Sequence, residues 1–536
     1  MADSVSTIES DRWSSWKPQG NGPVVGVWRS IVLALLLIGS AIAIWLRFSA
    51  SSLLWLDEAQ SVNIAKAPLR EIPTLLKQDG APPLYYFLLH FWMSLFGTSD
   101  AAVRSLSGVI SIVTVVLAFF VIRRVWGSEI GLISAVFIAS SPFAIYYATE
   151  TRMYSLVMLL VVLGIGALSK LFERQSLANW SAVTLFAALL AYTQYWSFYL
   201  LIVLAIWMAF VSLRAQSAAD RKSGRLTLLG FAGAGILFLP WLPTFLYQRK
   251  HTGTPWGDPP NFLTAAVAVF HFHSNQALQV PLSDVRQRGM ELIFILLFFL
   301  ALVGTSNTAY RFRLNWRTEP RGRFLAWVVF GTLVLGVVVS HFTNNAYTPR
   351  YGAVVYVPLV VFLGVGIAYF RQAFVRVGLV VVIAVGFFIG AYQEIHTQRT
   401  QAQQVVSALT AHAVPGDVAI FCPDELGPTV LRVLPSGTVH SVGYPRFVPP
   451  DIVDWVDYNS VLFHTNPSGF VAKAEALAGL NRVWLVWSPG YGASGPACTQ
   501  VAQVLAKQPN WQGTAVVDPD PQHYFQSMQL IEYTRK

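Results

Sequence analysis

The chain has 536 residues, of which 54% are hydrophobic and only 12% are charged, and its formal net charge is +10. Because an ordinary soluble domain has roughly 25% charged residues, a soluble core of this length is excluded. The apolar runs are uninterrupted, which excludes barrel strands that would alternate over about 10 residues. The basic residues cluster in short loops between these runs, so the charge follows membrane topology and does not indicate nucleic acid. The composition predicts a polytopic, all-α membrane protein.

The predicted elements begin with a polar segment, residues 1–28, which has no small-residue cleavage site after a short apolar core. We expect it to be a cytoplasmic tail before a retained first span. A spanning helix needs about 20 mostly apolar residues. Eleven such spans are predicted, within a transmembrane domain of residues 29–393, at approximately 29–47, 102–122, 129–148, 153–172, 179–195, 196–213, 226–246, 289–309, 324–341, 351–370 and 374–392.

Lysines and arginines set the predicted orientation. With the N-terminus inside, the even-numbered connections are cytoplasmic, and they carry Arg123, Arg124, Lys170, Arg174, Arg214, Arg221, Lys222, Arg225, Arg311, Arg313, Arg317, Arg321, Arg323, Arg371 and Arg376. An odd number of spans then places the C-terminal region, residues 394–536, outside the cytoplasmic membrane. Two outer loops, 48–101 and 247–288, are long for a bundle, and long ordered loops are usually functional.

The first outer loop contains two predicted amphipathic helices, 61–76 and 84–95, lying along the membrane surface. The C-terminal region alternates strands with helices, which predicts a small extracytoplasmic α/β domain. Its predicted strands are 418–421 and 482–487, and its predicted helices are 396–412, 468–479 and 497–507. Both cysteines, Cys422 and Cys498, lie there, where an oxidising compartment would allow a disulfide, although spacing alone does not decide whether they pair.

Two adjacent carboxylates, Asp57 and Glu58, follow the first span directly after Trp55 and Leu56. Adjacent carboxylates at a membrane interface cost desolvation energy unless they are solvated, paired or bound to a cation. One interpretation is simple solvation among the headgroups. The apolar neighbours favour a partly buried site instead, where desolvation raises a carboxyl pKa toward that of a useful base.

Other charged and aromatic residues gather on the same outer face. Glu150, Arg152 and Tyr154 lie between the third and fourth predicted spans, and Arg350 and Tyr351 begin the tenth. Structural alternatives exist: Arg350 would serve as an interfacial anchor, and Asp100 with Arg104 would form a structural pair. The sharper hypothesis is chemical, because an arginine binds and stabilises a departing phosphate while a carboxylate takes a proton from an attacking hydroxyl.

Three histidines in the second loop, His251, His271 and His273, are candidate metal ligands, but the HxH spacing of the last two is a weak metal signal, and a surface or headgroup role is favoured. No Walker motif, zinc-ligand CxxC pair or internal repeat is found. The sequence does not indicate an oligomeric state.

At five motifs the sequence resembles the GT-C superfamily of polyprenyl-phosphate-sugar-dependent glycosyltransferases. The branch with protein O-mannosyltransferases, aminoarabinose transferases and bacterial lipid-glycan mannosyltransferases fits best. In order, the motifs are Leu56-Asp57-Glu58-Ala59, Ala81-Pro82-Pro83-Leu84-Tyr85-Tyr86, Asp100-Ala-Ala-Val-Arg104-Ser-Leu-Ser107, Glu150-Thr-Arg152-Met-Tyr154-Ser-Leu156 and Pro349-Arg350-Tyr351. The resemblance implies a GT-C bundle and inverting transfer of a sugar, mannose by preference, to an extracytoplasmic hydroxyl of a cell-envelope glycan or glycolipid.

The resemblance also implies roles for individual residues. Asp57 is the expected general base, with Glu58 positioning the acceptor or tuning Asp57, and the two roles are interchangeable. Arg350, or Arg152, would bind the donor phosphate, and Glu150 would orient Arg152 or the acceptor hydroxyls. Tyr154 and Tyr351 would support the phosphate or stack on sugar.

The sequence departs from the family at two places where relatives carry histidine, here Ala81 and the segment 192–196. We therefore expect no obligatory metal and no other cofactor. The expected partners are the lipid-linked donor, the glycan or glycolipid acceptor and membrane lipids. The main alternative is a transporter or flippase of lipid-linked glycans, which would place ionisable residues at mid-span. A membrane anchor that presents a binding domain is a third hypothesis.

Overall fold

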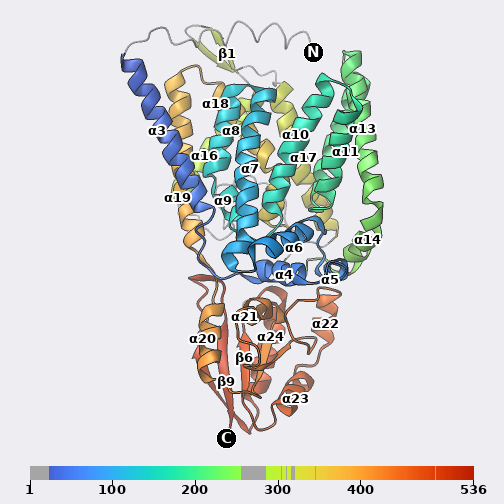
Figure 1. Ribbon diagram of the computed structural model, residues 1–536, viewed down its shortest axis with the longest axis vertical. Helices are drawn as coiled ribbons and strands as arrows, with labels where there is room; N and C mark the ends of the chain where they lie inside the picture. Colours follow the sequence, from blue (N-terminus) through green and yellow to red (C-terminus); the bar gives the residue numbers. More distant parts are fainter. Residues whose placement is uncertain are drawn as a thin grey trace.

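The structure, a computed structural model, describes residues 23–254, 257, 285–303, 305–308, 311–314, 320–343, 346–488 and 491–536. The described chain forms a helical bundle with a smaller α/β domain attached to one end (Figure 1). The helices of the bundle are α3 (Pro23–Leu46), α7 (Asp100–Trp126), α8 (Ser128–Ser140), α9 (Pro142–Ala148), α10 (Tyr154–Glu173), α11 (Leu177–Ala191), α12 (Ser197–Arg214), α13 (Ala218–Phe238), η2 (Leu239–Trp241), α14 (Leu242–His251), α16 (Val285–Val303), α17 (Pro320–Phe342), η4 (Pro349–Gly352), α18 (Ala353–Ala368) and α19 (Ala373–His396).

Seven helical segments of the described chain are long and apolar enough to cross a membrane, and they coincide with seven of the predicted spans. The chain is therefore an integral membrane protein. The predicted span 129–148 is a pair of helices, α8 and α9, bent by 56° at their junction. Three further predictions, 29–47, 179–195 and 289–309, coincide with shorter apolar helices, so the count of eleven spans stays a prediction.

One of these shorter helices ends earlier than predicted. Helix α16 stops at Val303, and the antiparallel pair β1 (Thr305–Thr308) and β2 (Arg311–Leu314) follows. The predicted end at residue 309 is wrong because polar residues from Thr305 onward end the apolar run.

The bend between α8 and α9 has a local cause in Pro142. Proline lacks an N–H, so it leaves the carbonyl of Ile138 without its helical donor. The buried side chain of Arg47, at the end of α3, supplies that donor through Nη2 at 2.9 Å, and its Nη1 donates to Ala139 at 2.8 Å. A charged residue at the membrane edge thus satisfies backbone groups that the proline frees.

Helix α18 forms the centre of the bundle. From Ala353 to Ile367 its residues are buried all round, which is typical of a core helix that packs on every side. The short turn η4 precedes it and contains Arg350. The position of Arg350 is therefore set by its attachment to an almost fully buried helix.

Three short helices lie across the end of the bundle, between it and the C-terminal domain (Figure 1): α4 (Leu56–Lys66), α5 (Ile72–Asp79) and α6 (Leu84–Phe96). The single predicted helix 61–76 is wrong. Ala67 precedes Pro68 and has an extended backbone, with φ −63° and ψ 157°, because the proline ring disfavours a helical conformation in the residue before it. The break separates α4 from α5, and α4 begins earlier than predicted, so that Asp57 and Glu58 lie in its first turn.

The C-terminal domain is built on a five-stranded sheet of order β5-β4-β6-β9-β7. Strands β5 (His440–Gly443), β4 (Val418–Cys422) and β6 (Val483–Trp487) are parallel. Strand β9 (Gln529–Arg535) pairs antiparallel with β6, and β7 (Trp511–Val517) pairs antiparallel with β9. The remaining elements are β3 (Gln398–Thr400), α20 (Ala402–His412), η5 (Asp424–Leu426), α21 (Gly427–Leu431), α22 (Tyr458–His464), α23 (Pro467–Ala478), η6 (Gly492–Ser494), α24 (Gly495–Ala506) and β8 (Tyr524–Gln526). The predicted helix 396–412 is wrong at its start, because β3 separates α19 from α20.

The domain is bound to the bundle by polar contacts at several points. Gln60 on α4 exchanges two hydrogen bonds with the backbone of Val453, at 3.0 and 2.8 Å. Arg432 binds the carboxylate of Asp100 at the start of α7, at 3.0 Å. His251, at the end of α14, contacts Asp457 at 3.1 Å. These contacts set one wall of the cavity described next.

Candidate active site

A cavity of about 1170 Å³ lies where the bundle, the α4–α5 layer and the C-terminal domain meet. Six of the seven residues predicted for the site line it: Asp57, Glu150, Arg152, Tyr154, Arg350 and Tyr351. They come from the first outer loop, the α9–α10 turn and η4. The prediction that these distant segments share one face of the bundle is therefore confirmed by their common cavity.

The carboxylate of Asp57 lies between two arginines. Its Oδ2 pairs with Nη1 of Arg350, and it lies 3.9 Å from Nε of Arg152. The three side chains are each between 13% and 16% exposed, so they face the cavity without being sealed from it. A site with two guanidinium groups beside one carboxylate carries excess positive charge, which suits a phosphate ligand.

Arg152 is held in place by a second network that the sequence did not reveal. Its Nη1 donates to Ser61 Oγ at 3.0 Å and to the hydroxyl of Tyr86 at 3.1 Å. Tyr86 donates to the carboxylate of Asp79 at 3.1 Å. Asp79 follows the predicted helix 61–76 and has no distinguishing pattern in the sequence, so only the fold identifies it.

Glu150 is buried beside the cavity, and only one of its two carboxylate oxygens is hydrogen-bonded within the described residues. Its Oε1 accepts a hydrogen bond from Trp55 Nε1 at 3.0 Å, and its Oε2 has no hydrogen-bond partner in the described part of the chain. Burial, opposed by the charge of Arg399, raises the pKa of Glu150 to about 7. Among the described residues its carboxylate forms no hydrogen bond or ion pair with the Arg152 side chain, so its role in orienting Arg152 or the acceptor hydroxyls stays a prediction.

Glu58 does not line the cavity, and the prediction that it positions the acceptor or exchanges roles with Asp57 is corrected. Its carboxylate is fully buried and accepts from Arg104 at 2.6 and 2.8 Å, from Arg399 at 3.2 Å and from the N–H of Thr151 at 3.0 Å. Burial alone would raise the pKa of Glu58, but the two arginines and the N–H lower it to about 2. It is a structural anion.

These contacts also overturn the predicted pair of Asp100 with Arg104. Arg104 turns inward to Glu58, and Asp100 pairs with Arg432 of the C-terminal domain. The i, i+4 spacing on α7 permitted a local pair, but a fully buried carboxylate needs compensation more than an interfacial one does.

Arg399 is the cation that the sequence analysis missed. It lies in β3, just after α19, and reaches back to Glu58 and to the carbonyl of Thr149 at 2.9 Å. Its guanidinium lies 4.5 Å from the centre of the Tyr146 ring. The available sequence signal for Arg399 was its position three residues after α19, the last helix of the bundle. Gln194, in a segment where relatives carry histidine, also lines the cavity, and its amide has no hydrogen-bond partner in the described chain.

The two predicted tyrosines line the cavity wall near the arginines. The Tyr351 ring stacks on Trp196 with centroids 5.3 Å apart, and the Tyr154 ring contacts that of Tyr147 at 4.7 Å. His271 and His273 lie outside the described residues. Among the residues that are described, no group of three or more His, Cys, Asp or Glu is placed to hold a metal ion. Metal independence stays a prediction.

Comparison with known proteins gives the fold a context. Residues 80–243 match the sequence family described as dolichyl-phosphate-mannose-protein mannosyltransferase. ArnT from Cupriavidus metallidurans, solved bound to undecaprenyl phosphate, superposes with a TM-score of 0.53 at 10% identity, over 93% of this chain and 97% of its own. The chain has the GT-C fold. The predicted resemblance to the GT-C superfamily is therefore confirmed.

Two other solved GT-C proteins agree. The arabinofuranosyltransferase AftD from Mycobacteria has a TM-score of 0.52 at 14% identity, over 94% of this chain and 40% of that protein. The Archaeoglobus fulgidus oligosaccharyltransferase, solved with Zn and sulfate, has a TM-score of 0.50 at 13% identity, over 90% and 71% of the two chains. No curated protein sequence matches this chain. The family match includes Glu150, Arg152 and Tyr154 but neither Asp57 nor Arg350, which the GT-C fold brings beside them.

Proposed function

We propose that this chain is an inverting glycosyltransferase that moves one sugar from a polyprenyl-phosphate donor to a hydroxyl of an extracytoplasmic glycan or glycolipid. Mannose is the sugar that we propose, because the matching sequence family is described as using dolichyl-phosphate-mannose. The observation that carries the proposal is the carboxylate of Asp57 between Arg350 and Arg152, facing a large cavity at the end of a GT-C bundle.

The two arginines would bind the donor phosphate. A phosphate is a dianion or monoanion with several acceptor oxygens, and guanidinium groups bind it bidentately. On binding, it would compete with Asp57 for Arg350 and Arg152. The donor would thereby free the carboxylate for the reaction, so that the base becomes available only when the leaving group is in place.

An apolar arm of the same cavity suits the lipid chain. Its wall is formed by α12, α13 and α14, through the side chains of Phe198, Tyr199, Ile202, Phe238, Leu242 and Phe245. Ile202 lines this part of the cavity and is 47% exposed, which would let it contact a lipid chain. A polyprenyl tail could therefore enter from the bilayer and leave its phosphate at the arginines.

The proposed reaction uses these groups in a single displacement. The acceptor oxygen attacks the anomeric carbon and forms the new C–O bond while the bond from that carbon to the phosphate oxygen breaks. The departing electron pair stays on the phosphate, which Arg350 and Arg152 stabilise. The acceptor proton passes to Asp57, which acts as general base.

Glu150 is the second candidate for the base. Its unpaired Oε2 and a pKa raised to about 7 by burial are properties of a general base poised near neutral pH. Asp57 is preferred because it is more exposed to the cavity and lies against the phosphate-binding arginines. Glu150 would then bind an acceptor hydroxyl.

The proposed orientation has the site and the C-terminal domain outside the cytoplasm. Basic residues concentrate in the opposite set of loops. The disulfide between Cys422 and Cys498 supports this placement, since disulfides persist in oxidising compartments and are rare in the cytosol.

The experiment uses purified full-length chain in lipid nanodiscs with undecaprenyl phosphate as the probe. Binding to wild type is compared with binding to Arg350→Gln and to a matched control, Arg124→Gln, whose arginine forms a surface pair with Glu173. We expect Arg350→Gln to weaken binding at least tenfold, the effect of losing one charge-assisted hydrogen bond of about 1.5–3 kcal/mol. Equal binding by all three proteins would contradict the phosphate site. Lipid movement across the bilayer without sugar transfer would favour a flippase.

A further inference from the structure

One wall of the cavity belongs to the C-terminal domain. Besides Arg399 of β3, the residues that it contributes are Glu425, Trp455, Tyr491, Gly492, Ser494 and Phe525. The proposed donor-binding groups come instead from the α4–α5 layer and the bundle. The cavity thus has a donor wall and an opposite wall for which the proposed reaction has assigned no role.

The fold of the domain explains why this wall carries functional groups. Glu425 follows the carboxyl end of β4, and Tyr491 follows that of β6, two adjacent parallel strands. In open α/β sheets, ligands bind outside the carboxyl ends of parallel strands, where the connecting loops diverge. The domain turns this edge of its sheet toward the cavity.

Glu425 is the buried polar group at the centre of this wall. It is 1% exposed, and its Oε1 accepts from Ser494 Oγ at 3.3 Å. Its Oε2 has no hydrogen-bond partner within the described residues. A buried carboxyl oxygen that lines a cavity and has no partner among the described residues is suited to a ligand donor.

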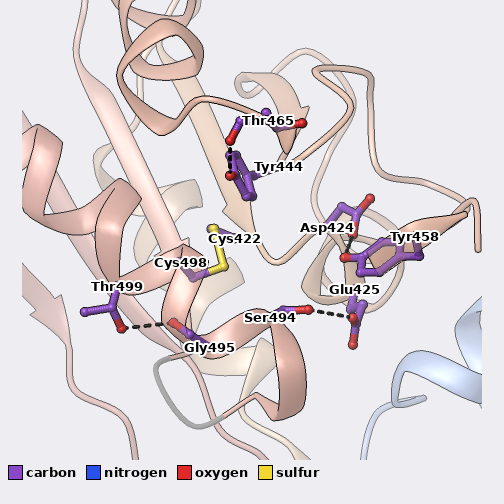
Figure 2. The surroundings of a disulfide bond; sticks show 10 residues. All are labelled: Cys422, Asp424, Glu425, Tyr444, Tyr458, Thr465, Ser494, Gly495, Cys498 and Thr499. Carbon is purple, nitrogen blue, oxygen red and sulfur yellow. Dashed lines mark hydrogen bonds between the residues drawn. A yellow bond between two sulfur atoms is a disulfide. The ribbon is translucent and has the colours of Figure 1, made fainter. Parts of the chain in front are cut away.

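The surroundings of Glu425 indicate which chemical group of a ligand it would bind. Burial and the neighbouring Asp424 raise the pKa of Glu425 well above its ordinary value. Figure 2 shows Asp424 and Glu425 beside Tyr458, whose hydroxyl donates to Asp424 at 2.6 Å. A carboxyl held neutral both donates and accepts hydrogen bonds, as a sugar hydroxyl requires, and it does not attract a cation.

Aromatic side chains of the same domain line the cavity together with this carboxyl. Tyr491 and Trp455 line the cavity, and Phe525, 56% exposed, packs edge-on against Trp55 at 5.3 Å. Aromatic walls with a few placed polar groups are typical of small-molecule sites, and flat rings suit the apolar faces of sugars.

A covalent link fixes the two turns that form the wall. The disulfide joins Cys422, at the end of β4, to Cys498 on α24 (Figure 2). Asp424 and Glu425 lie just beyond the first cysteine, and Ser494 precedes α24. The bond between Ser494 and Glu425 therefore closes a small ring of contacts beside the disulfide.

We propose that Glu425, Trp455, Tyr491 and Phe525 form the acceptor subsite and that it takes a neutral glycan, with Glu425 hydrogen-bonded to a sugar hydroxyl. This inference rests on the proposed transfer reaction and narrows its acceptor to the glycan part of a polysaccharide or glycolipid. Glu425 is a positioning residue, because it binds the acceptor away from the reacting atoms.

The experiment measures transfer by the full-length chain from radiolabelled polyprenyl-phosphate-mannose to a glycan extract of the cell envelope. Acceptor KM, donor KM and hydrolysis of donor without acceptor are measured for wild type, Glu425→Leu and Glu425→Gln. The control is Glu475→Leu, because Glu475 lies in the same domain, also has an unpartnered oxygen, and does not line the cavity.

We expect Glu425→Leu to raise the acceptor KM about tenfold, the effect of one lost hydrogen bond to a buried group, with donor KM and donor hydrolysis unchanged. Glu425→Gln keeps a neutral hydrogen-bonding group and should recover most of this loss. An unchanged acceptor KM in Glu425→Leu, or an equal loss of donor hydrolysis, would overturn the acceptor subsite and leave the transferase intact. Absence of both transfer and donor hydrolysis in wild type would overturn the proposed function and the subsite with it.

Discussion

Neutralising each of the two adjacent carboxylates on α4 should have different effects. Loss of the Glu58 charge should lower the stability of the protein, and loss of the Asp57 charge should lower its transfer activity. Glu58 is fully buried between Arg104 and Arg399, and its pKa is lowered from 4.5 to about 2. A depressed carboxyl pKa contributes stability that is present above the unfolded pKa and is lost as pH falls toward 2. At neutral pH a shift of this size corresponds to about 3 kcal/mol, within the roughly 3–5 kcal/mol expected when one partner of a buried ion pair is removed.

Glu58→Gln should therefore destabilise the protein by about 3 kcal/mol, because two buried arginines lose their counter-charge. Asp57→Asn removes a carboxylate whose arginine partners remain 13% and 16% exposed, so its effect on stability should be small. Its effect on transfer should be large, about 10²–10⁴-fold for loss of a general base.

The assay is thermal unfolding of the purified full-length chain, followed by tryptophan fluorescence, alongside transfer activity well below the unfolding temperature. We expect a lowered midpoint for Glu58→Gln with activity retained in the folded fraction, and the reverse for Asp57→Asn. A Glu58→Gln protein with unchanged stability and abolished transfer would refute the structural role of Glu58.

Three further predictions concern conditions and the C-terminal domain. Burial raises the pKa of Asp424 to about 7 from 3.8, so folding takes up a proton between these values, and the stability that this group contributes falls as pH rises through 7. Asp424→Asn, which keeps an acceptor for Tyr458, should flatten this fall in chemical unfolding measured from pH 5 to 8. Chelation with EDTA should leave transfer unchanged, and a loss restored by one divalent ion would contradict metal independence. Replacing Cys422 and Cys498 by serine should lower stability by about 4 kcal/mol, because the bridge closes a loop of 76 residues, and should raise the acceptor KM; unchanged values of both would contradict its bracing role.

The bundle and the outline of the site were predictable because they depend on local signals. Long apolar runs define helices, and Asp57, Arg152 and Arg350 lie near the outer ends of the first, fourth and tenth predicted spans. A topology that puts those ends on one face brings their side chains together. The break at Ala67 and Pro68 was also readable, because proline restricts the residue before it, but the amphipathic pattern from Ser61 to Leu76 concealed it.

The different roles of Asp57 and Glu58 were not predictable, because they depend on hydrogen-bond and ion-pair partners that are distant in the sequence. Asp57 and Glu58 are neighbours with the same chemistry, yet one faces the cavity and the other is buried. Glu58 is satisfied by Arg104, 46 residues away, and by Arg399, 341 residues away. No periodicity in α4 reveals those partners. Glu425 likewise lies in an unremarkable turn until the fold places that turn against the cavity.

The most direct test of the central claim is transfer of radiolabelled mannose from polyprenyl phosphate to envelope glycan by membranes that contain wild type or Asp57→Asn. Asp57 contacts both Arg350 and Arg152 at the cavity. We expect transfer by wild type and its loss in an Asp57→Asn protein that is folded and still binds undecaprenyl phosphate. Undiminished transfer by Asp57→Asn would contradict its role as the base and assign that role to Glu150. Absence of transfer by wild type from every polyprenyl-phosphate sugar supplied would contradict the transferase itself.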